Sequence, residues 1–429
     1  MGMQYHRDRR AGPRSGMETA FEAALGTRKN DFGHGGAAAR VKVNFWRRRV
    51  RRGGGFYIGE GLQLAIGRYP PKMTDRIYLD HASTTPIIPA AREAFAKGVA
   101  EWGNPNSPHA EGRRSRSLLE EARQTIADML GWRHDVIFTS GASESVELAA
   151  RCATPAGRAH GATEHAIVGY VMGESSTVIR VDANGLIDEA ALDEALSNGP
   201  SLVAIQQVNN ETGVIQPLER LAPKIREVGS LLLSDCAQSA SKMTLPDADF
   251  IAVCAHKLGG PPGVGALLVR DLATLKACGG GQEKGYRRGT QDVPGAMAFA
   301  AALSARPYDI DRLALLRERL EDGVRACGGI VIGEAAPRVP TIGAIALPGG
   351  SSAALLVQFD LAGMAVSAGS ACSSGKAKAS HVLSAMRIPD EVAVGFLRIS
   401  FGPYTSEADV DAFLAEWRRI AERTATKAA

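Results

Sequence analysis

Four short segments of the sequence contain residue types that could take part in catalysis. The first is Phe138–Ser145, in which a predicted strand passes through small residues into a helix with Glu144 in its first turn. Small residues allow the backbone to approach an anion, and a helix N-terminus offers free N–H groups and a favourable dipole. The segment could therefore bind a phosphate. An ordinary helix N-cap followed by an acidic first turn also explains these residues.

Two further segments place an ionisable side chain at the end of a predicted strand. Asp235 lies at the C-terminal end of a strand that begins at Leu231, and ligands bind at that end of parallel strands. It could hold a protonated heterocyclic nitrogen, or it could cap a helix. Lys257 lies between another strand end and the glycine-proline loop Leu258–Gly263. A desolvated lysine has a lowered pKa and can form a Schiff base with an aldehyde, whereas a surface-loop lysine would stay solvated.

The fourth segment, Val366–Lys376, surrounds Cys372 with Gly, Ser and Ala. We expect a mobile loop with an accessible thiol, which Lys376 or Lys378 could favour as the thiolate. A buried, inert cysteine is the alternative. The segment does not match a phosphate-binding P-loop, because its glycines are wrongly spaced and Ala377 stands where that motif requires Ser or Thr.

The four segments together supply what a pyridoxal 5'-phosphate site requires. They offer a phosphate cradle, an acid for the pyridinium nitrogen, a lysine for the cofactor aldehyde and a separate nucleophile. Each signal is weak when taken alone, so the prediction depends on their combination.

Short apolar runs alternate with amphipathic stretches from Arg76 onward, which predicts the elements that position these segments. The predicted strands are Asp135–Thr139, Thr177–Val181, Leu202–Val208, Leu231–Asp235, Phe250–Ala255 and Gly265–Val269. The predicted helices are Glu144–Arg151, Leu218–Val228, Arg312–Ala326 and Ser406–Arg423, with the start of the second left open by Pro223. This alternation favours an α/β fold, with a mostly parallel sheet flanked by helices in a large domain. The longer helices after about residue 310 indicate a smaller α+β domain.

Composition excludes some classes of function. The chain has 429 residues, of which 45% are hydrophobic and 22% charged, as in a globular protein with one large or two coupled domains. Residues 1–72 carry 15 Lys and Arg against 5 Asp and Glu, and the remainder carries 35 against 41. The body therefore lacks the basic field of a nucleic-acid-binding protein. No apolar run approaches the roughly 18 residues that cross a membrane.

The cysteines and the first 72 residues lead to two separate expectations. None of the six cysteines is spaced as CxxC, so we expect no metal site and free thiols in a reducing cytoplasm. Residues 1–72 are rich in Gly and Arg and are expected to be a disordered or mis-started leader, with Met73 as the true start. A targeting peptide and a nucleic-acid-binding arm are the alternatives.

Several ordered segments across roughly residues 76–420 resemble the class V aminotransferase family, and within it the cysteine desulfurases of the iron–sulfur assembly type. The segments that carry the resemblance are Tyr78–Pro86, Gly103–His109, Thr163–His165, Val208–Gly213, Arg287–Thr290 and Gly369–Cys372. The resemblance implies a homodimer of pyridoxal-phosphate fold type I. Its large domain would span 88–310, and its small domain would combine 73–87 with 311–429.

The resemblance also implies a role for individual residues. Lys257 matches the lysine that holds the cofactor, His165 the histidine that stacks on its ring, and Cys372 the cysteine that takes the sulfur. The other implied cofactor contacts are Asp235 at the pyridinium nitrogen, Gln238 and Asn210 at the ring oxygen, Ala142, Ser143 and His256 at the phosphate, and Thr290 at the phosphate of the other subunit. Arg398 matches the arginine that clamps the substrate carboxylate, together with Asn210, and its planar fork suits that task.

The implied reaction converts L-cysteine to L-alanine and leaves a persulfide on Cys372 for a sulfur-acceptor or scaffold protein. A selenocysteine lyase or an aminotransferase of the same fold is one alternative, and a catalytically silent sulfur-relay subunit is another. Two departures from the family pattern matter. Cys254 stands where a serine is usual and would be a poorer phosphate donor. The short stretch Ala421–Ala429 leaves the scaffold partner open.

Overall fold

The structure is a computed structural model that describes residues 76–369 and 380–428. The expectations for the leader, residues 1–72, and for Cys372 therefore fall outside the described residues. No helix in the described ranges is long and apolar enough to cross a membrane.

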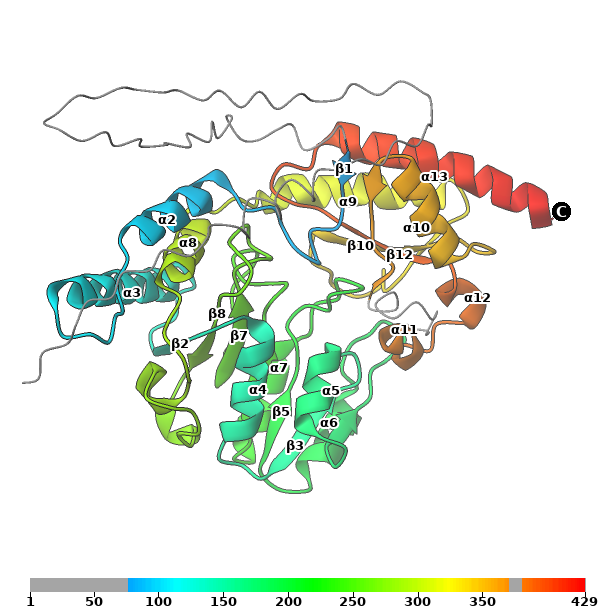
Figure 1. Cartoon of the computed structure of the whole chain (residues 1–429). Coiled ribbons are helices and arrows are strands. Elements are labelled where there is room, and N and C mark those ends of the chain that lie inside the picture. Colours follow the sequence, from blue (N-terminus) through cyan, green and yellow to red (C-terminus); the bar gives the residue numbers. More distant parts are fainter. Residues whose placement is uncertain (1–75, 370–379, 429) are drawn as a thin grey trace, which may run out of the picture. The chain divides into compact units, whose positions relative to one another are not determined.

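A seven-stranded sheet forms the centre of the larger part of the fold (Figure 1). In spatial order its strands are β2 (Asp135–Thr139), β8 (Gly265–Val269), β7 (Phe250–Cys254), β6 (Leu231–Asp235), β5 (Ser201–Ala204), β3 (Gly157–Gly161) and β4 (Thr177–Ile179). Strand β8 runs antiparallel to both of its neighbours, whereas the pairs from β7 to β4 are parallel. The predicted mostly parallel sheet is confirmed.

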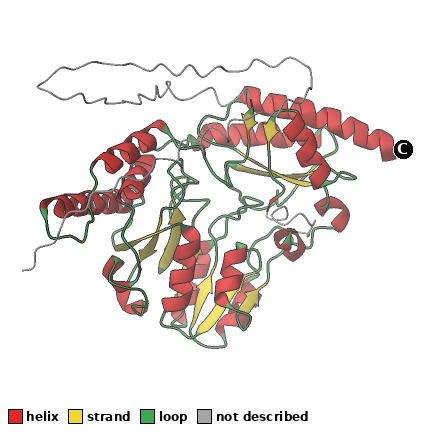
Figure 2. Ribbon diagram, in the orientation of Figure 1, coloured by secondary structure: helices red, strands yellow, loops and turns green. Residues whose placement is uncertain are grey.

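Helices cover both faces of this sheet, as Figure 2 shows. They are α3 (Ala110–Met129), α4 (Ala142–Cys152), α5 (Ala166–Met172), α6 (Glu189–Leu196), α7 (Leu218–Glu227) and α8 (Val293–Ser304), with short 3-10 helices at Leu272–Thr274 and Glu283–Gly285. Helix α2 (Pro89–Ala100) packs against α8 instead. Alternate strand residues supply two cores, because successive side chains of a strand point to opposite faces. Ile251 packs with α3, α6, α7 and α8, whereas Phe250 and Ala252 pack with α4 and α5. Burial on both faces explains the continuous apolar runs of the sequence.

The first described residues, from Arg76 on, and the described part of the C-terminal third form a second group of elements. The strands β12 (Phe396–Ser400), β10 (Ile342–Ala346) and β9 (Ile330–Val331) make an antiparallel sheet, and β1 (Ile77–Tyr78) pairs in parallel with β11 (Met364–Ala365). The helices are α9 (Ile310–Arg325), α10 (Ser352–Leu361), α11 (His381–Ala385), α12 (Asp390–Ala393) and α13 (Glu407–Ala428). The fully buried Phe359 and Phe413 stack 4.7 Å apart in their core. The division into domains of 88–310 and 73–87 plus 311–429 stays a prediction.

Most predicted elements agree with the structure, and the differences lie at their ends. Helix α7 runs through Pro223, because its apolar face, with Leu221 and Ile225 fully buried, offsets the lost hydrogen bond. Strand β5 ends at Ala204 instead of Val208, because Val208 pairs with Ile215 in a tight turn of the chain.

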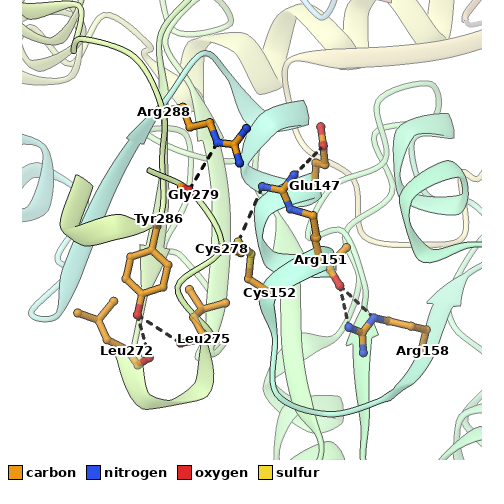
Figure 3. Close-up of a disulfide and its surroundings, with 11 residues drawn as sticks. Glu147, Arg151, Cys152, Arg158, Leu272, Leu275, Cys278, Gly279, Tyr286 and Arg288 are labelled. Carbon is orange, nitrogen blue, oxygen red and sulfur yellow. Dashed lines mark hydrogen bonds and ion pairs between the residues drawn. A yellow bond between two sulfur atoms is a disulfide. The ribbon is translucent and has the colours of Figure 1, made fainter. Parts of the chain in front are cut away.

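The expectation that the cysteines are free thiols is wrong for one pair. Cys152, the last residue of α4, forms a disulfide with Cys278, which follows β8 along the chain (Figure 3). The two Cα atoms are 6.2 Å apart although 126 residues separate them in the sequence. Of the other described cysteines, Cys236, Cys254 and Cys327 are free.

Candidate active site

A cavity of about 500 Å³ lies beyond the ends of the central strands and gathers most of the predicted site residues. The predicted residues that line it are Ala142, Ser143, His165, Asn210, Asp235, His256, Lys257 and Arg398. The lining residues without a predicted role are Ala82, Ser83, Ser140, Gly141, Glu144, Ile167, Ala237, Cys254, Pro262, Gly263 and Gly369. Among the described residues, no group of His, Cys, Asp and Glu could hold a metal ion.

The N-terminus of α4 opens onto this cavity. Its N-cap is Gly141, which has no side chain to cap the helix, and the first backbone bond runs from Ser145 N to Gly141 O. The N–H groups of Ala142 and Ser143 therefore have no hydrogen-bond partner in the described part of the chain. This geometry favours an anion site over the simple N-cap.

Asp235 ends β6 and presents its carboxylate to the cavity. Its Oδ1 accepts a hydrogen bond from Ala237 N at 2.8 Å, and no helix follows, so the helix-cap alternative does not apply. A second carboxyl, that of Glu164, is buried nearby. Burial, and then the charge of Asp235, raises the pKa of Glu164 well above its usual value. The Glu164 carboxyl therefore favours its neutral form.

Lys257 lies three residues after Cys254, where β7 ends, and is partly buried rather than fully solvated. Two residues outside the sheet hold the backbone here. Tyr308 Oη donates to Lys257 O at 2.9 Å, and Thr85 N donates to the preceding carbonyl, His256 O, at 2.8 Å. Burial, followed by the Lys257 charge, lowers the pKa of His256 to about 4. A lysine fixed at a strand end with its side chain in a cavity is unlike a surface-loop lysine.

His165 caps the N-terminus of α5. Its Nδ1 accepts a hydrogen bond from Ile167 N at 3.3 Å, so the proton of the neutral ring lies on Nε2. Burial lowers the pKa of His165, an effect that Asp235 opposes and Lys257 reinforces. The ring is therefore neutral near pH 7 and can stack on another flat ring.

Arg398 comes from β12 and reaches the cavity from the opposite side. Its Nη1 donates to Asn210 O at 2.9 Å, and its Nη2 donates to Asp80 Oδ1 at 2.8 Å and to Ser83 Oγ at 2.6 Å. The Nε atom is buried without a partner among the described residues. A guanidinium fixed in this way, with a donor to spare, suits a carboxylate ligand.

Two predicted site residues that the structure describes are not part of the cavity lining, and a third is not described. Gln238 donates from Nε2 to Ala82 O at 2.9 Å, and its Oε1 is buried without a described partner. Thr290 is exposed and lies outside the lining, and its contact with another subunit stays a prediction. Cys372 lies outside the described residues, although Gly369, three residues earlier, lines the cavity.

Sequence reasoning did not assign a role to Asp80 or Ser83. Both belong to the segment Tyr78–Pro86, which carried part of the family resemblance but no identified chemistry. The signal that could have found them is the polar run Asp80–Thr85 directly after a short apolar stretch. That pattern also occurs at ordinary strand ends, so it has little specificity.

The comparison with protein families identifies the chain. Residues 77–413 match the model of the aminotransferase class-V family. The chain belongs to the class V aminotransferase family. A cysteine desulfurase of Cereibacter sphaeroides is 35% identical over 364 residues, which cover 79% of this chain and 94% of that protein. An IscS-like cysteine desulfurase of Mycobacterium tuberculosis is 39% identical over 372 residues, with the same coverage.

Solved structures agree with this family. A NifS-like protein from Rickettsia africae superposes with a TM-score of 0.75 at 28% identity, covering 81% of this chain and 99% of that one. The fold is therefore that of class V aminotransferases, which is pyridoxal-phosphate fold type I.

The cavity fits the pyridoxal 5'-phosphate on which class V aminotransferases depend. The unpaired N–H groups at the start of α4 match a phosphate, and Asp235 matches a protonated ring nitrogen. In the buried amide of Gln238, Nε2 is held by its hydrogen bond to Ala82 O, whereas Oε1 has no partner among the described residues. Cys254 is buried, and burial raises the pKa of its thiol, so it would offer the phosphate only a weak neutral donor.

Proposed function

We propose that the chain is a cysteine desulfurase, which converts L-cysteine to L-alanine and places the sulfur on Cys372. The observation that carries the proposal is the position of Gly369, which lines the same cavity as Lys257, Asp235 and Arg398. Cys372 follows Gly369 by three residues, and three extended residues span at most about 10 Å. A chain segment of this length would allow the thiol to reach a substrate in the cavity.

Different residues of the cavity bind the substrate, hold the cofactor and transfer the proton. Arg398 binds the substrate carboxylate, with Asn210 beside it. Lys257 would hold the cofactor and would take the α-proton of the substrate. Asp235 would keep the ring nitrogen protonated, and His165 would stack on the ring. When bound, the cofactor supplies an electron sink for the negative charge that develops on the substrate.

Cys372 carries out the sulfur transfer. Its thiolate attacks the substrate sulfur, an S–S bond forms, and the C–S bond of the substrate breaks. The three-carbon fragment takes up one proton at Cβ, regains one at Cα and leaves as L-alanine, while Cys372 keeps the persulfide. The curated relatives are named cysteine desulfurases, which favours this reaction over transamination or selenocysteine cleavage.

Further features of the proposal concern assembly and location. We infer a homodimer in which Thr290 of each subunit serves the other, because Thr290 is exposed and outside the cavity of its own chain. The sulfur passes to an acceptor or scaffold protein for iron–sulfur clusters or other thio-cofactors. A cytoplasmic location stays a prediction, and the Cys152–Cys278 disulfide is the observation against it.

The proposal is tested by purifying the chain and recording its visible absorption. We expect a bound cofactor that borohydride reduction and peptide mapping locate on Lys257, and release of alanine and sulfide from L-cysteine in the presence of a thiol. A cofactor linked to a different lysine, or a loaded enzyme that does not turn over L-cysteine, would overturn the assignment.

A further inference from the structure

The Cys152–Cys278 disulfide joins a buried helix end to a segment made of glycine (Figure 3). Cys152 is buried at the end of α4, whereas Cys278 is half-buried and is followed by Gly279–Gly281, the glycine segment. Glycine loses more conformational freedom on ordering than any other residue, so a run of glycines needs an anchor to stay in one place. The disulfide supplies that anchor at the start of the glycine segment.

The glycine segment is bonded in turn to two arginines that follow it in the sequence. Gly280 N donates to Arg287 O at 3.1 Å, and Arg288 Nε donates to Gly279 O at 3.5 Å. Gln282 and Arg287 also exchange backbone hydrogen bonds. The position of the Arg287 backbone therefore depends on the glycine segment and on the disulfide that anchors it.

The side chain of Arg287 reaches the end of α4 that opens onto the cofactor cavity. Its Nε donates to Glu144 Oε1 at 2.9 Å, and Glu144 Oε2 accepts from Ser140 N, just before the helix. The N–H groups of Ala142 and Ser143, which suit the cofactor phosphate, belong to the same first turn. The disulfide at one end of α4 is thus connected, through the glycine segment and Arg287, to the anion site at the other end.

A second cavity, of about 530 Å³, lies between α4 and the glycine segment. Its lining includes Arg151 of α4 together with Gly279 and Arg288. The backbone pairing beside the disulfide ends at Lys276, whose N–H donates to Cys152 O at 2.8 Å. Without the disulfide, the glycine segment would therefore keep few contacts with α4 and would have room to move.

We propose that the Cys152–Cys278 disulfide is a redox switch that controls how tightly the chain holds pyridoxal 5'-phosphate. In the linked form, Arg287 stays on Glu144 and the start of α4 stays ordered for the phosphate. Reduction releases the glycine segment and weakens cofactor binding. This inference depends on the cofactor and not on the reaction proposed for Cys372, so either can fail without the other.

A small dithiol can bring about the reduction. One of its thiolates attacks the half-buried Cys278 sulfur and forms a mixed disulfide, while the Cys152 sulfur leaves with the bonding electron pair and takes up a proton. The second thiol then closes a cyclic disulfide within the dithiol and releases Cys278 as a thiolate. Arg151 Nη2 lies 3.8 Å from the Cys278 sulfur, and a cation in this place stabilises the leaving thiolate.

The test measures the dissociation constant for pyridoxal 5'-phosphate by absorbance in two forms of the full chain. One form is purified without reductant, and the other is reduced with a dithiol that is then removed without oxygen. We expect reduction to weaken binding by about fivefold to a hundredfold. Because such coupling is reciprocal, saturating cofactor should shift the equilibrium with the dithiol toward the linked form by the same factor, as peptide mapping of the linked fraction measures.

Three variants isolate the route from the disulfide to the cofactor. Cys278→Ser should bind the cofactor as weakly as the reduced protein and should not respond to the dithiol. Arg287→Gln loses the contact with Glu144, so its linked and reduced forms should bind the cofactor alike. Cys327→Ser is the matched control, because Cys327 is a free thiol, and it should respond to the dithiol as the unaltered protein does.

Tryptic cleavage after the exposed Arg288 reports the movement itself, without any cofactor. It should be faster in the reduced protein, whereas cleavage after Arg319, an exposed residue of α9, should be unchanged. The inference is overturned if protein purified without reductant yields unlinked peptides, or if the linked and reduced forms bind the cofactor equally. A Cys278→Ser variant that responds to the dithiol as the unaltered protein does would overturn it as well.

Discussion

Arg398 Nη2 lies 2.8 Å from Asp80 Oδ1, although 318 residues separate these two side chains in the sequence. The same Nη2 donates to Ser83 Oγ, and Nη1 donates to Asn210 O. The guanidinium side chain is only 5% exposed and is held in one orientation before any ligand arrives. Such preorganisation lowers the cost of ordering the site when substrate binds.

The first prediction is that Arg398→Lys weakens the binding of L-cysteine. An ammonium group cannot keep the contacts to Asp80 and Asn210 and also bind a carboxylate in a bidentate way. Hydrogen bonds to charged groups contribute about 1.5–3 kcal/mol each, so KM should rise about tenfold to a hundredfold. Steady-state kinetics measures it. Arg319→Lys is the control, because Arg319 forms an exposed pair with Asp411. An unchanged KM would contradict the role of Arg398.

The second prediction concerns the disulfide. Cys278→Ser should lower the melting temperature, because the bond closes a loop of 126 residues and so restricts the unfolded chain. Loss of a native disulfide costs about 2–5 kcal/mol. Scanning calorimetry measures the shift, and peptide mapping without reductant identifies the linked peptides. The free Cys327 provides the control variant Cys327→Ser. Unlinked peptides, or equal melting temperatures for the two variants, would count against the bond.

The third prediction is a loss of stability in mild acid. Burial, and then the charge of Lys242, lowers the pKa of His81 from its usual 6.5 to about 4. Between these values the unfolded chain binds more protons than the folded one. The stability contribution is therefore complete above about pH 6.5 and is lost as the pH falls toward about 4. Urea unfolding at neutral and acidic pH should show a smaller pH dependence for His81→Gln. The exposed His134 provides the control, and an equal effect of His134→Gln would refute this explanation.

The fourth prediction is that a chain starting at Met73 binds the cofactor and keeps full desulfurase activity. The family match begins at residue 77, and the composition changes near residue 73. Cofactor absorbance, oligomeric state and turnover of the shortened chain are compared with those of the full chain. An insoluble product, or one without cofactor, would show that residues 1–72 contribute to the fold.

The sequence was sufficient to predict elements whose signal is local. Asp235 and Lys257 each follow an apolar run that is buried on both faces of the sheet, so the strands and the residues at their ends could be recognised. Strand β3 could not, because its sequence Gly-Arg-Ala-His-Gly has no apolar run, although it lies between two other strands.

The sequence contains no comparable local pattern from which contacts between distant parts of the chain could be predicted. Asp80 reaches the site because β1, next to it in the sequence, pairs with β11, and because Asp80 itself forms a bridge with Ser400. The approach of Cys152 to Cys278 likewise depends on how α4 packs on the sheet. The roles of Arg398 and Gln238 came from the family resemblance, and no local pattern would have identified them.

The most direct measurement of the central claim is the location of the transferred sulfur. The unaltered protein and Cys372→Ser are mixed rapidly with L-cysteine, quenched, and analysed by peptide mass spectrometry for an added sulfur atom. We predict the added sulfur on Cys372 in the unaltered protein. In the Cys372→Ser variant, L-cysteine should still change the cofactor absorbance, but alanine and sulfide release should collapse, because a hydroxyl is a far weaker nucleophile toward sulfur than a thiolate. Sulfur found on Cys236 or Cys254 instead, or undiminished sulfide release by Cys372→Ser, would contradict the account.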